Sequence, residues 1–233
     1  MWLADLAWPD AADRAAAGAV LAVPLGATEQ HGPHLPLSTD TDIAVVLCRR
    51  LASARPDVLI APAVAYGSSG EHDGFAGTLS VGPAAVEQLV LELGRSATKV
   101  FRHVLFVSAH GGNAEPVTRA VHRLRSRSRH VTLFQPRWPR DAHAGHDETG
   151  LQLAIDPGRV RMERAVLGNT QPLAALMPQL RAHGVRAVSP SGVLGDPTNA
   201  TAAEGAALLD DLATDLIRHV TTWLGPPRPG GGA

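Results

Sequence analysis

The chain has 233 residues, a formal net charge of -1 and a hydrophobic fraction of 45%. The near-neutral charge and the apolar content exclude an intrinsically disordered chain and a globally basic nucleic-acid-binding protein. The length predicts one α/β domain, at residues 1–224, followed by a disordered tail rich in proline and glycine at 225–233.

Cysteine usage and the N-terminal residues predict a cytoplasmic protein. Cys48 is the only cysteine, which excludes an intramolecular disulfide and a cysteine-based metal site. Asp5 and Asp10 stand where a secretory signal peptide needs a basic start and an apolar core. No apolar run approaches the ~20 residues of a membrane span, so we expect no membrane partner.

Short β-type runs alternate with helical stretches along the chain. The predicted strands are 19–25, 58–64, 103–109 and 131–135, and the predicted helices are 41–54, 83–99, 115–127 and 201–224. This alternation predicts an α/β fold with a mostly parallel sheet flanked by helices. The last helix has the clearest signals, because Thr201 and Glu204 form a capping box ahead of an apolar stripe at helical spacing.

Polar segments follow the predicted strands. Residues 29–40 come after the first strand, 66–78 after the second, 110–113 after the third and 143–148 soon after the fourth. In an open parallel sheet, ligands bind outside the carboxyl ends of the strands. We therefore expect these loops to converge on one edge of the sheet.

The first loop, EQHGPHLPLSTD, contains Glu29, His31, His34 and Asp40. Its prolines stiffen an extended loop, and residues two apart in an extended chain lie on the same side, as Glu29 and His31 do. An imidazole beside a carboxylate suits Zn, Mn or Fe(II). The segment alone leaves open a polar loop whose histidines serve only the structure.

The segment SAHGGN puts His110 at the end of a predicted strand, beside two glycines that allow close backbone approach. Asn113 is predicted to cap the following helix. By itself, this histidine could equally be a turn residue.

The segment DAHAGHDETG adds His143, His146, Asp147 and Glu148 before a helical stretch. Compensation of the helix dipole explains Asp147, because an acidic group is favoured at a helix N-terminus. It does not explain the histidines, since a protonated imidazole is disfavoured there.

In this order and spacing, the three segments resemble the creatininase superfamily, whose members share an EQHGPHLP..TD loop, a GH or AH motif with GGN or a variant, and a HAG..ET motif. The resemblance spans roughly residues 24–205. Within the superfamily, segments 65–80 and 187–205 are most similar to the family of mycofactocin precursor peptide peptidases. The competing G-x-S-x-G, P-loop, H-E-x-x-H and G-x-G-x-x-G motifs do not occur.

The resemblance implies a metal-dependent amidohydrolase with two divalent ions, either Zn, Fe(II) or Mn. Glu29, Asp40 and His110 would hold one ion. His31, Asp40 and Glu148 would hold the other, so that Asp40 bridges the two. Creatininase proper has a further glutamate ligand two residues after the motif histidine, where this chain has Gly112. We expect Glu148 to take that role.

The resemblance also implies catalytic roles for His143 and Glu148, with His143 donating a proton to the departing amine. Residues 66–78 and 188–201 are rich in Gly, Ser and Thr, which suits a groove that binds a peptide backbone. We assign substrate binding to Ser68, Glu71 and His72 in the first of these segments. The alternative is that both segments are ordinary loops.

The implied substrate is a modified ribosomal precursor peptide, from which the enzyme would release a Val-Tyr-derived C-terminal dipeptide, and the implied assembly is a homo-oligomer. One alternative is a creatininase-like or formamide amidohydrolase that acts on a small cyclic or linear amide. An alternative of another class is a non-catalytic metal-binding scaffold. The arginine-rich run at 119–129 is expected to be a solvated helix face, with no nucleic-acid partner.

Overall fold

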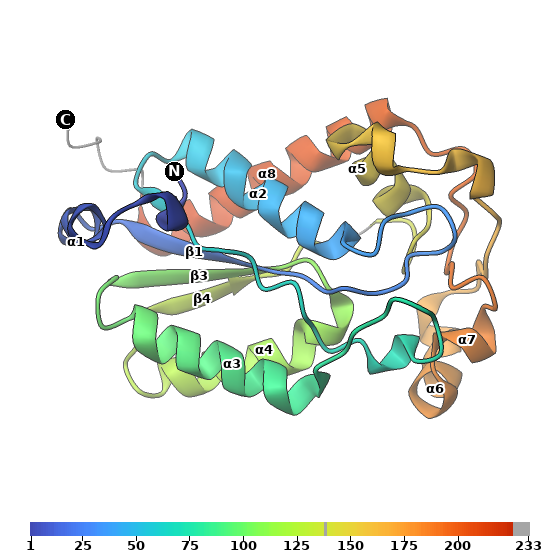
Figure 1. Cartoon of the computed structure of the whole chain (residues 1–233), viewed down its shortest axis with the longest axis horizontal. Coiled ribbons are helices and arrows are strands. Elements are labelled where there is room, and N and C mark those ends of the chain that lie inside the picture. The colour runs from blue at the N-terminus through green and yellow to red at the C-terminus, as the bar shows by residue number, and fades with distance from the viewer. Residues whose placement is uncertain (138, 226–233) are drawn as a thin grey trace.

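A parallel sheet runs through the middle of the molecule (Figure 1). The computed structural model describes residues 1–137 and 139–225, and the tail predicted at 225–233 lies outside the described residues except for Gly225. In the described part of the chain, four strands pair in the order β2-β1-β3-β4. They are β1 (Val20–Leu25), β2 (Val58–Ile60), β3 (His103–Ser108) and β4 (Val131–Phe134).

The second strand is shorter than predicted, because Pro62 has no N–H to continue the ladder. The backbone N–H of Ala61 still donates to Ala22, and Val64 then forms an isolated bridge with Leu25. The segment that was expected to continue as a strand therefore turns early into the loop at 66–78.

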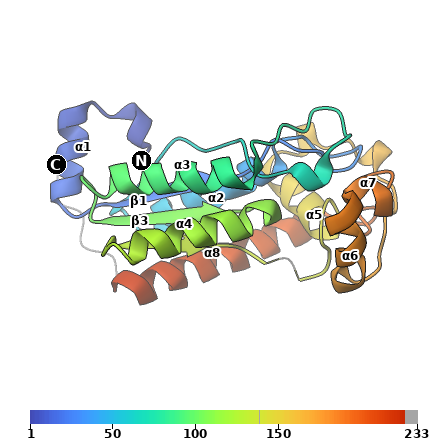
Figure 2. The ribbon, with the colours of Figure 1, turned by 90° about the horizontal axis from the view of Figure 1, so that it is seen from below.

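Helices cover both faces of the sheet, which confirms the predicted α/β class (Figures 1 and 2). One face carries α2 (Thr39–Ala54), α5 (His146–Ile155) and α8 (Ala202–Leu224), and the other carries α3 (Gly82–Ala97) and α4 (Ala114–Arg125). The alternation of strand side chains explains the two layers. Val20 and Ala22 pack under α2 and α8, whereas Leu21 and Val23 pack under α3 and α4.

The predicted capping of α8 is present, since the Thr201 side chain accepts a hydrogen bond from the Glu204 backbone N–H at 3.2 Å. Three further helices were not predicted from the sequence, namely α1 (Trp8–Ala16), α6 (Leu173–His183) and α7 (Val185–Val188). Five short 3-10 helices complete the described elements, namely η1 (Leu3–Asp5), η2 (Gly70–His72), η3 (Gly111–Asn113), η4 (Pro157–Arg159) and η5 (Met162–Arg164).

Two features of this architecture position the site. The chain leaves β1 for α2 on one face and leaves the neighbouring β3 for α4 on the other, so the carboxyl ends of β1 and β3 form a topological switch point. Beyond this edge lie α6 and α7, at the opposite end of the molecule from α1 (Figure 1). None of the described helices combines the length and the apolar character that a membrane span requires.

Candidate metal centre

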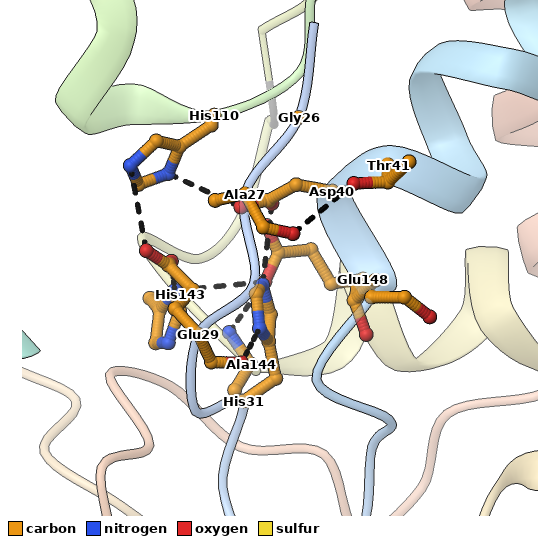
Figure 3. Close-up of polar contacts among 12 residues, drawn as sticks. Gly26, Ala27, Glu29, His31, Asp40, Thr41, His110, His143, Ala144 and Glu148 are labelled. Carbon is orange, nitrogen blue, oxygen red and sulfur yellow. Dashed lines mark hydrogen bonds and ion pairs between the residues drawn. The ribbon is translucent and has the colours of Figure 1, made fainter. Parts of the chain in front are cut away.

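Five side chains that were predicted as ligands meet at the switch point (Figure 3). They come from the loop after β1, the first turn of α2, the end of β3 and the first turn of α5. None of them is more than 4% exposed. The five residues are Glu29, His31, Asp40, His110 and Glu148.

Asp40 faces two histidines, one with each carboxylate oxygen. Its Oδ1 lies 3.2 Å from Nε2 of His31, and its Oδ2 lies 3.1 Å from Nδ1 of His110. Two ligands that each stand ~2.1 Å from one zinc ion are roughly 3.0 to 3.5 Å apart. The carboxylate of Asp40 is therefore placed to serve two neighbouring cation positions.

Each of these positions has a third group. Oε2 of Glu148 lies 3.9 Å from Nε2 of His31, and Oε2 of Glu29 approaches His110 at the ring nitrogen that does not face Asp40, 3.4 Å from Nε2. In the set Glu29, Asp40, His110 and in the set His31, Asp40, Glu148, the ligand atoms all lie within 4.8 Å of one another. The structure thus brings together both predicted ligand sets.

The outer contacts of the two histidines fit metal ligands. His31 turns Nδ1 to the backbone oxygen of Glu29 at 3.1 Å, and His110 turns Nε2 to the backbone oxygen of Ser68 at 2.8 Å. A ligating histidine donates its other ring N–H to such an acceptor in most metal sites. This leaves Nε2 of His31 and Nδ1 of His110 for the cluster, where both face Asp40.

The pKa values and the unpaired oxygens of the cluster also favour bound cations. Burial raises the pKa of Glu29 to about 8 and that of Glu148 to about 7. Burial lowers the pKa of His31 and His110, but the surrounding carboxylates outweigh it and raise both to about 10. Oε2 of Glu29 and Oδ2 of Asp40 are buried without a hydrogen bond. Two divalent ions would replace the protons and pair these oxygens, so the residues fit the implied metals.

A tight turn positions Glu148 in the cluster and His143 beside it. Ala144 has a left-handed φ of 51°, a conformation that costs an alanine about 1 kcal/mol or more, and its N–H donates to Oε2 of Glu148 at 2.6 Å. Nδ1 of His143 lies 3.8 Å from Oε1 of Glu29 and 4.0 Å from Oε2 of Glu148. Burial, followed by the charge of His31, keeps the pKa of His143 well below its usual value.

The three residues assigned to substrate binding lie on the loop at 66–78, next to His110. Ser68 and His72 are buried, whereas Glu71 is partly exposed. Nε2 of His72 lies 3.3 Å from Oε1 of Glu29, which puts His72 in contact with the cluster. A Cβ at position 112 would overlap the carbonyl oxygen of Ser68 and stand 2.5 Å from Oε1 of Glu71.

Two histidines of the motifs lie away from the cluster. His34 makes a 2.8 Å hydrogen bond with the hydroxyl of Thr149, and burial lowers its pKa to about 4. His146 pairs with Glu204 at 3.2 Å on the outside of α5 and α8.

The predicted side-chain cap by Asn113 is wrong. Asn113 occupies the N-cap position of α4 without a capping hydrogen bond. Its Oδ1 instead accepts from the N–H of Ser68, and its Nδ2 donates to the carbonyl of Gly26, both at 3.0 Å. This amide joins the loop after β1 to the loop after β2, because both loops come within its reach at the switch point.

Gln30, which is 5% exposed and lies between Glu29 and His31, was not predicted as a site residue. Its amide contacts His72 and His143. The only available signal was its place inside the motif, and alternation along an extended chain would have turned it away from its two neighbours.

Comparison with known proteins identifies the family to which the chain belongs. The family model described as creatinine amidohydrolase matches residues 4–220. A protein of Mycobacterium tuberculosis named mycofactocin precursor peptide peptidase is 47% identical over 91% of this chain and 87% of its own length. A protein of the same name from Mycolicibacterium smegmatis is 49% identical over 89% and 86% of the two chains.

Solved creatininases share the fold. A mutant creatininase of the Zn-Zn type superposes with a TM-score of 0.84 at 22% identity, over 97% of this chain and 98% of the other. A structure named creatininase Mn gives a TM-score of 0.79 at 24% identity, over 97% and 99%. Because the family model covers nearly the whole chain and two relatives are 47% and 49% identical to it, the chain belongs to the creatininase family.

Proposed function

We propose that this chain is a metal-dependent peptidase of mycofactocin biosynthesis. It hydrolyses a peptide bond near the C-terminus of a modified ribosomal precursor peptide and releases a Val-Tyr-derived dipeptide. The observation that carries this proposal is the 47% identity, over 91% of the chain, with a protein named mycofactocin precursor peptide peptidase. The cluster of buried carboxylates and imidazoles supports the hydrolytic chemistry.

Glu29, Asp40 and His110 would hold one divalent ion, and His31, Asp40 and Glu148 the other. The names of the solved creatininases include zinc and manganese, and the mixed oxygen and nitrogen donors suit Zn, Mn or Fe(II). Such ions supply Lewis acidity, which acidifies water and polarises a scissile carbonyl. The three ligand carboxylates offset most of the positive charge of two divalent ions.

We assign proton transfer to side chains of this chain. His143 stands beside Glu29 and Glu148 and is the group that delivers a proton to the departing amine nitrogen. Glu148 serves as both ligand and catalytic carboxylate, and the N–H of Ala144 holds it in place at 2.6 Å. A hydrogen bond to a carboxylate fixes which oxygen faces the cluster.

The loop at 66–78 forms the substrate side of the site. Ser68, Glu71 and His72 lie on it, and Arg186 of α7 fastens it by donating to the carbonyl of Gly74 at 2.7 Å. Glu71 is partly exposed, and we assign its carboxylate to contact with a bound peptide. A cytoplasmic homo-oligomer without membrane or nucleic-acid partners completes the proposal.

A second candidate is hydrolysis of a small cyclic amide such as creatinine. It is favoured by the name of the family model and by a creatinine amidohydrolase of Pseudomonas putida, 28% identical over 71% of this chain and 76% of its own length. The lower identity makes it the weaker candidate.

The test is to incubate the metal-loaded protein with modified precursor peptide, unmodified peptide and creatinine in parallel, and to identify products by mass spectrometry. We expect the C-terminal dipeptide from the modified peptide only, since binding energy is used on the altered terminus. Equal cleavage of both peptides contradicts the specificity. Turnover of creatinine alone selects the second candidate, and a metal-loaded protein that cleaves nothing is a scaffold.

A further inference from the structure

The buried amide of Gln30 lies at the centre of a hydrogen-bond network. Its Nε2 is 2.8 Å from Nδ1 of His72, 3.1 Å from Nε2 of His143 and 3.2 Å from the backbone oxygen of Gly192. The two imidazoles also face each other, with ring centroids 4.4 Å apart. One glutamine therefore touches both histidines that border the metal ligands without being predicted ligands.

Backbone groups determine which end of the amide faces the histidines. The N–H of Gly32 points at Oε1 of Gln30 from 2.8 Å, and the carbonyl oxygen of Gly192 lies near Nε2. A backbone N–H can only donate and a backbone carbonyl can only accept. The oxygen end of Gln30 must therefore face Gly32, and the NH2 end must face the imidazoles.

The direction of the amide sets the proton on His72. An NH2 group has two hydrogens and no lone pair to accept with, so Nδ1 of His72 must be the acceptor. The neutral ring then carries its proton on Nε2, which lies 3.3 Å from Oε1 of Glu29.

A second contact sets the proton on His143. Nε2 of this ring lies 2.9 Å from the backbone carbonyl oxygen of Gln30. Two acceptors at this distance repel each other, so Nε2 must carry a hydrogen and donate it to that oxygen. The two hydrogens of the Gln30 amide then go to His72 and Gly192, and every group in the network is satisfied.

We propose that Gln30 is a positioning residue, whose side-chain amide holds His72 in the Nε2–H form and whose backbone carbonyl holds His143 in the same form. His143 then presents an unprotonated Nδ1 to the side of Glu29 and Glu148. His72 presents a donor to Glu29 and is excluded as a ligand through Nε2. The shape of the site agrees, because a Cβ at Gly192, which has a φ of 81°, would overlap Oε1 of Gln30.

The Nε2–H form of His143 sets the order in which its Nδ1 accepts and donates a proton. This order rests on the proposed function. Its Nδ1 first accepts a proton from the water whose oxygen bonds to the carbonyl carbon. It then gives the same proton to the amine nitrogen as the C–N bond breaks. His143 therefore begins the cycle as a base and serves as the acid only in the second half.

The test uses the full chain loaded with zinc and labelled with ¹⁵N at histidine. Long-range ¹H–¹⁵N correlation spectra distinguish the two neutral tautomers, and the His72→Gln and His143→Gln variants assign the two signals. We expect the Nε2–H form for both rings. An Nδ1–H signal from either ring in the unaltered protein overturns the proposal, and this reading needs neither a Gln30 variant nor a substrate.

Two variants test the role of Gln30 itself. In Gln30→Glu a carboxylate replaces the donor, and the His72 ring is expected to gain a proton on Nδ1. In Gln30→Met we expect full zinc content and a fall in kcat of about 10- to 100-fold, the range for partners of site residues, with little change in KM. The control is Gln152→Met, another buried glutamine, whose amide contacts Thr39 and Asp42 instead of the histidines.

An unchanged His72 signal in Gln30→Glu, or unchanged kcat in Gln30→Met, overturns the positioning role. Failure of the chain to cleave the precursor peptide would contradict the proposed function, whereas the tautomer spectra are read without that peptide. The two failures are therefore distinguishable.

Discussion

The carbonyl oxygen of Ser68 occupies the space in which a Cβ atom of residue 112 would stand, and Gly112 leaves that space free. The same oxygen accepts the ring N–H of His110 at 2.8 Å. Close approach of the loop at 66–78 thus orients a proposed ligand and explains why this chain has glycine where creatininase proper has glutamate.

Replacing Gly112 tests this contact. In Gly112→Ala the added Cβ forces the carbonyl of Ser68 away, and overpacking of this kind costs about 1 to 3 kcal/mol of unfolding free energy. We expect a lower thermal midpoint, reduced zinc content and reduced peptide cleavage. Gly111→Ala is the matched control, because a Cβ there meets nothing within 4 Å. Equal behaviour of the two variants would show that the contact is unimportant.

Removing the charge of Asp40 should abolish the binding of both metal ions. Each oxygen of this carboxylate faces a different histidine, so Asp40→Asn weakens both cation positions at once. Elemental analysis of the dialysed variant is expected to find neither ion. Asp42→Asn, on the same helix but paired with Arg159, should retain both ions. Two retained ions in Asp40→Asn would remove this residue from the bridge.

Glu148→Gln should weaken the binding of one metal ion more than that of the other. Glu148 approaches His31 but belongs to only one of the two ligand sets, and Gly112 offers no replacement carboxylate. Zinc titration of the metal-free protein is expected to show one site of nearly normal affinity and one of reduced affinity. An unchanged titration together with unchanged activity would mean that another group fills this role.

His143→Gln is expected to retain both metals and lose turnover by roughly 10²- to 10⁴-fold, the range for a missing proton donor. The reason is that Nδ1 of His143 stands 3.8 and 4.0 Å from its nearest carboxylates, farther than His31 or His110 stand from Asp40. The measurement is the cleavage rate of the modified peptide at a confirmed metal content. Loss of metal from this variant would make His143 a ligand.

Zinc affinity should weaken as the pH falls. In the metal-free site the pKa is about 8 for Glu29 and about 7 for Glu148, both raised from 4.5, so each carboxyl gains a proton as the pH falls through its value. Metal binding must then displace these protons, whereas above pH 8 the carboxylates are already free. His31 and His110 have pKa values of about 10 in the metal-free site, so they are protonated throughout this pH range. Each of them must therefore lose a proton when the metal binds.

Isothermal titration calorimetry in buffers of different ionisation enthalpy measures both the affinity and the number of protons released. Glu148→Gln is the control, since it removes one titrating group and should flatten the dependence near pH 7. A constant zinc affinity from pH 8 to below pH 7 would contradict the prediction.

The sequence by itself indicated the fold class, the four strands with the helices that flank them and, through the family resemblance, the five proposed ligands. Strand alternation, the Thr201 cap and the placement of polar loops after strands are local patterns, and parallel strands bring their carboxyl ends to one edge whatever the details. The motifs around Glu29, His110 and Glu148 therefore pointed to one site before any contact was known. The family assignment followed from the same residues and is confirmed by the matching model.

Only the tertiary structure decided how the groups around that site are held. Gln30 meets His143 across 113 positions of sequence, Asn113 joins Gly26 to Ser68, and Ser68 fills the space beside Gly112. Spacing along the chain does not encode such pairings, because they depend on the direction in which each donor and acceptor points. The proposed proton positions on His72 and His143 follow from those directions, which are set only when the loops pack together in the folded chain.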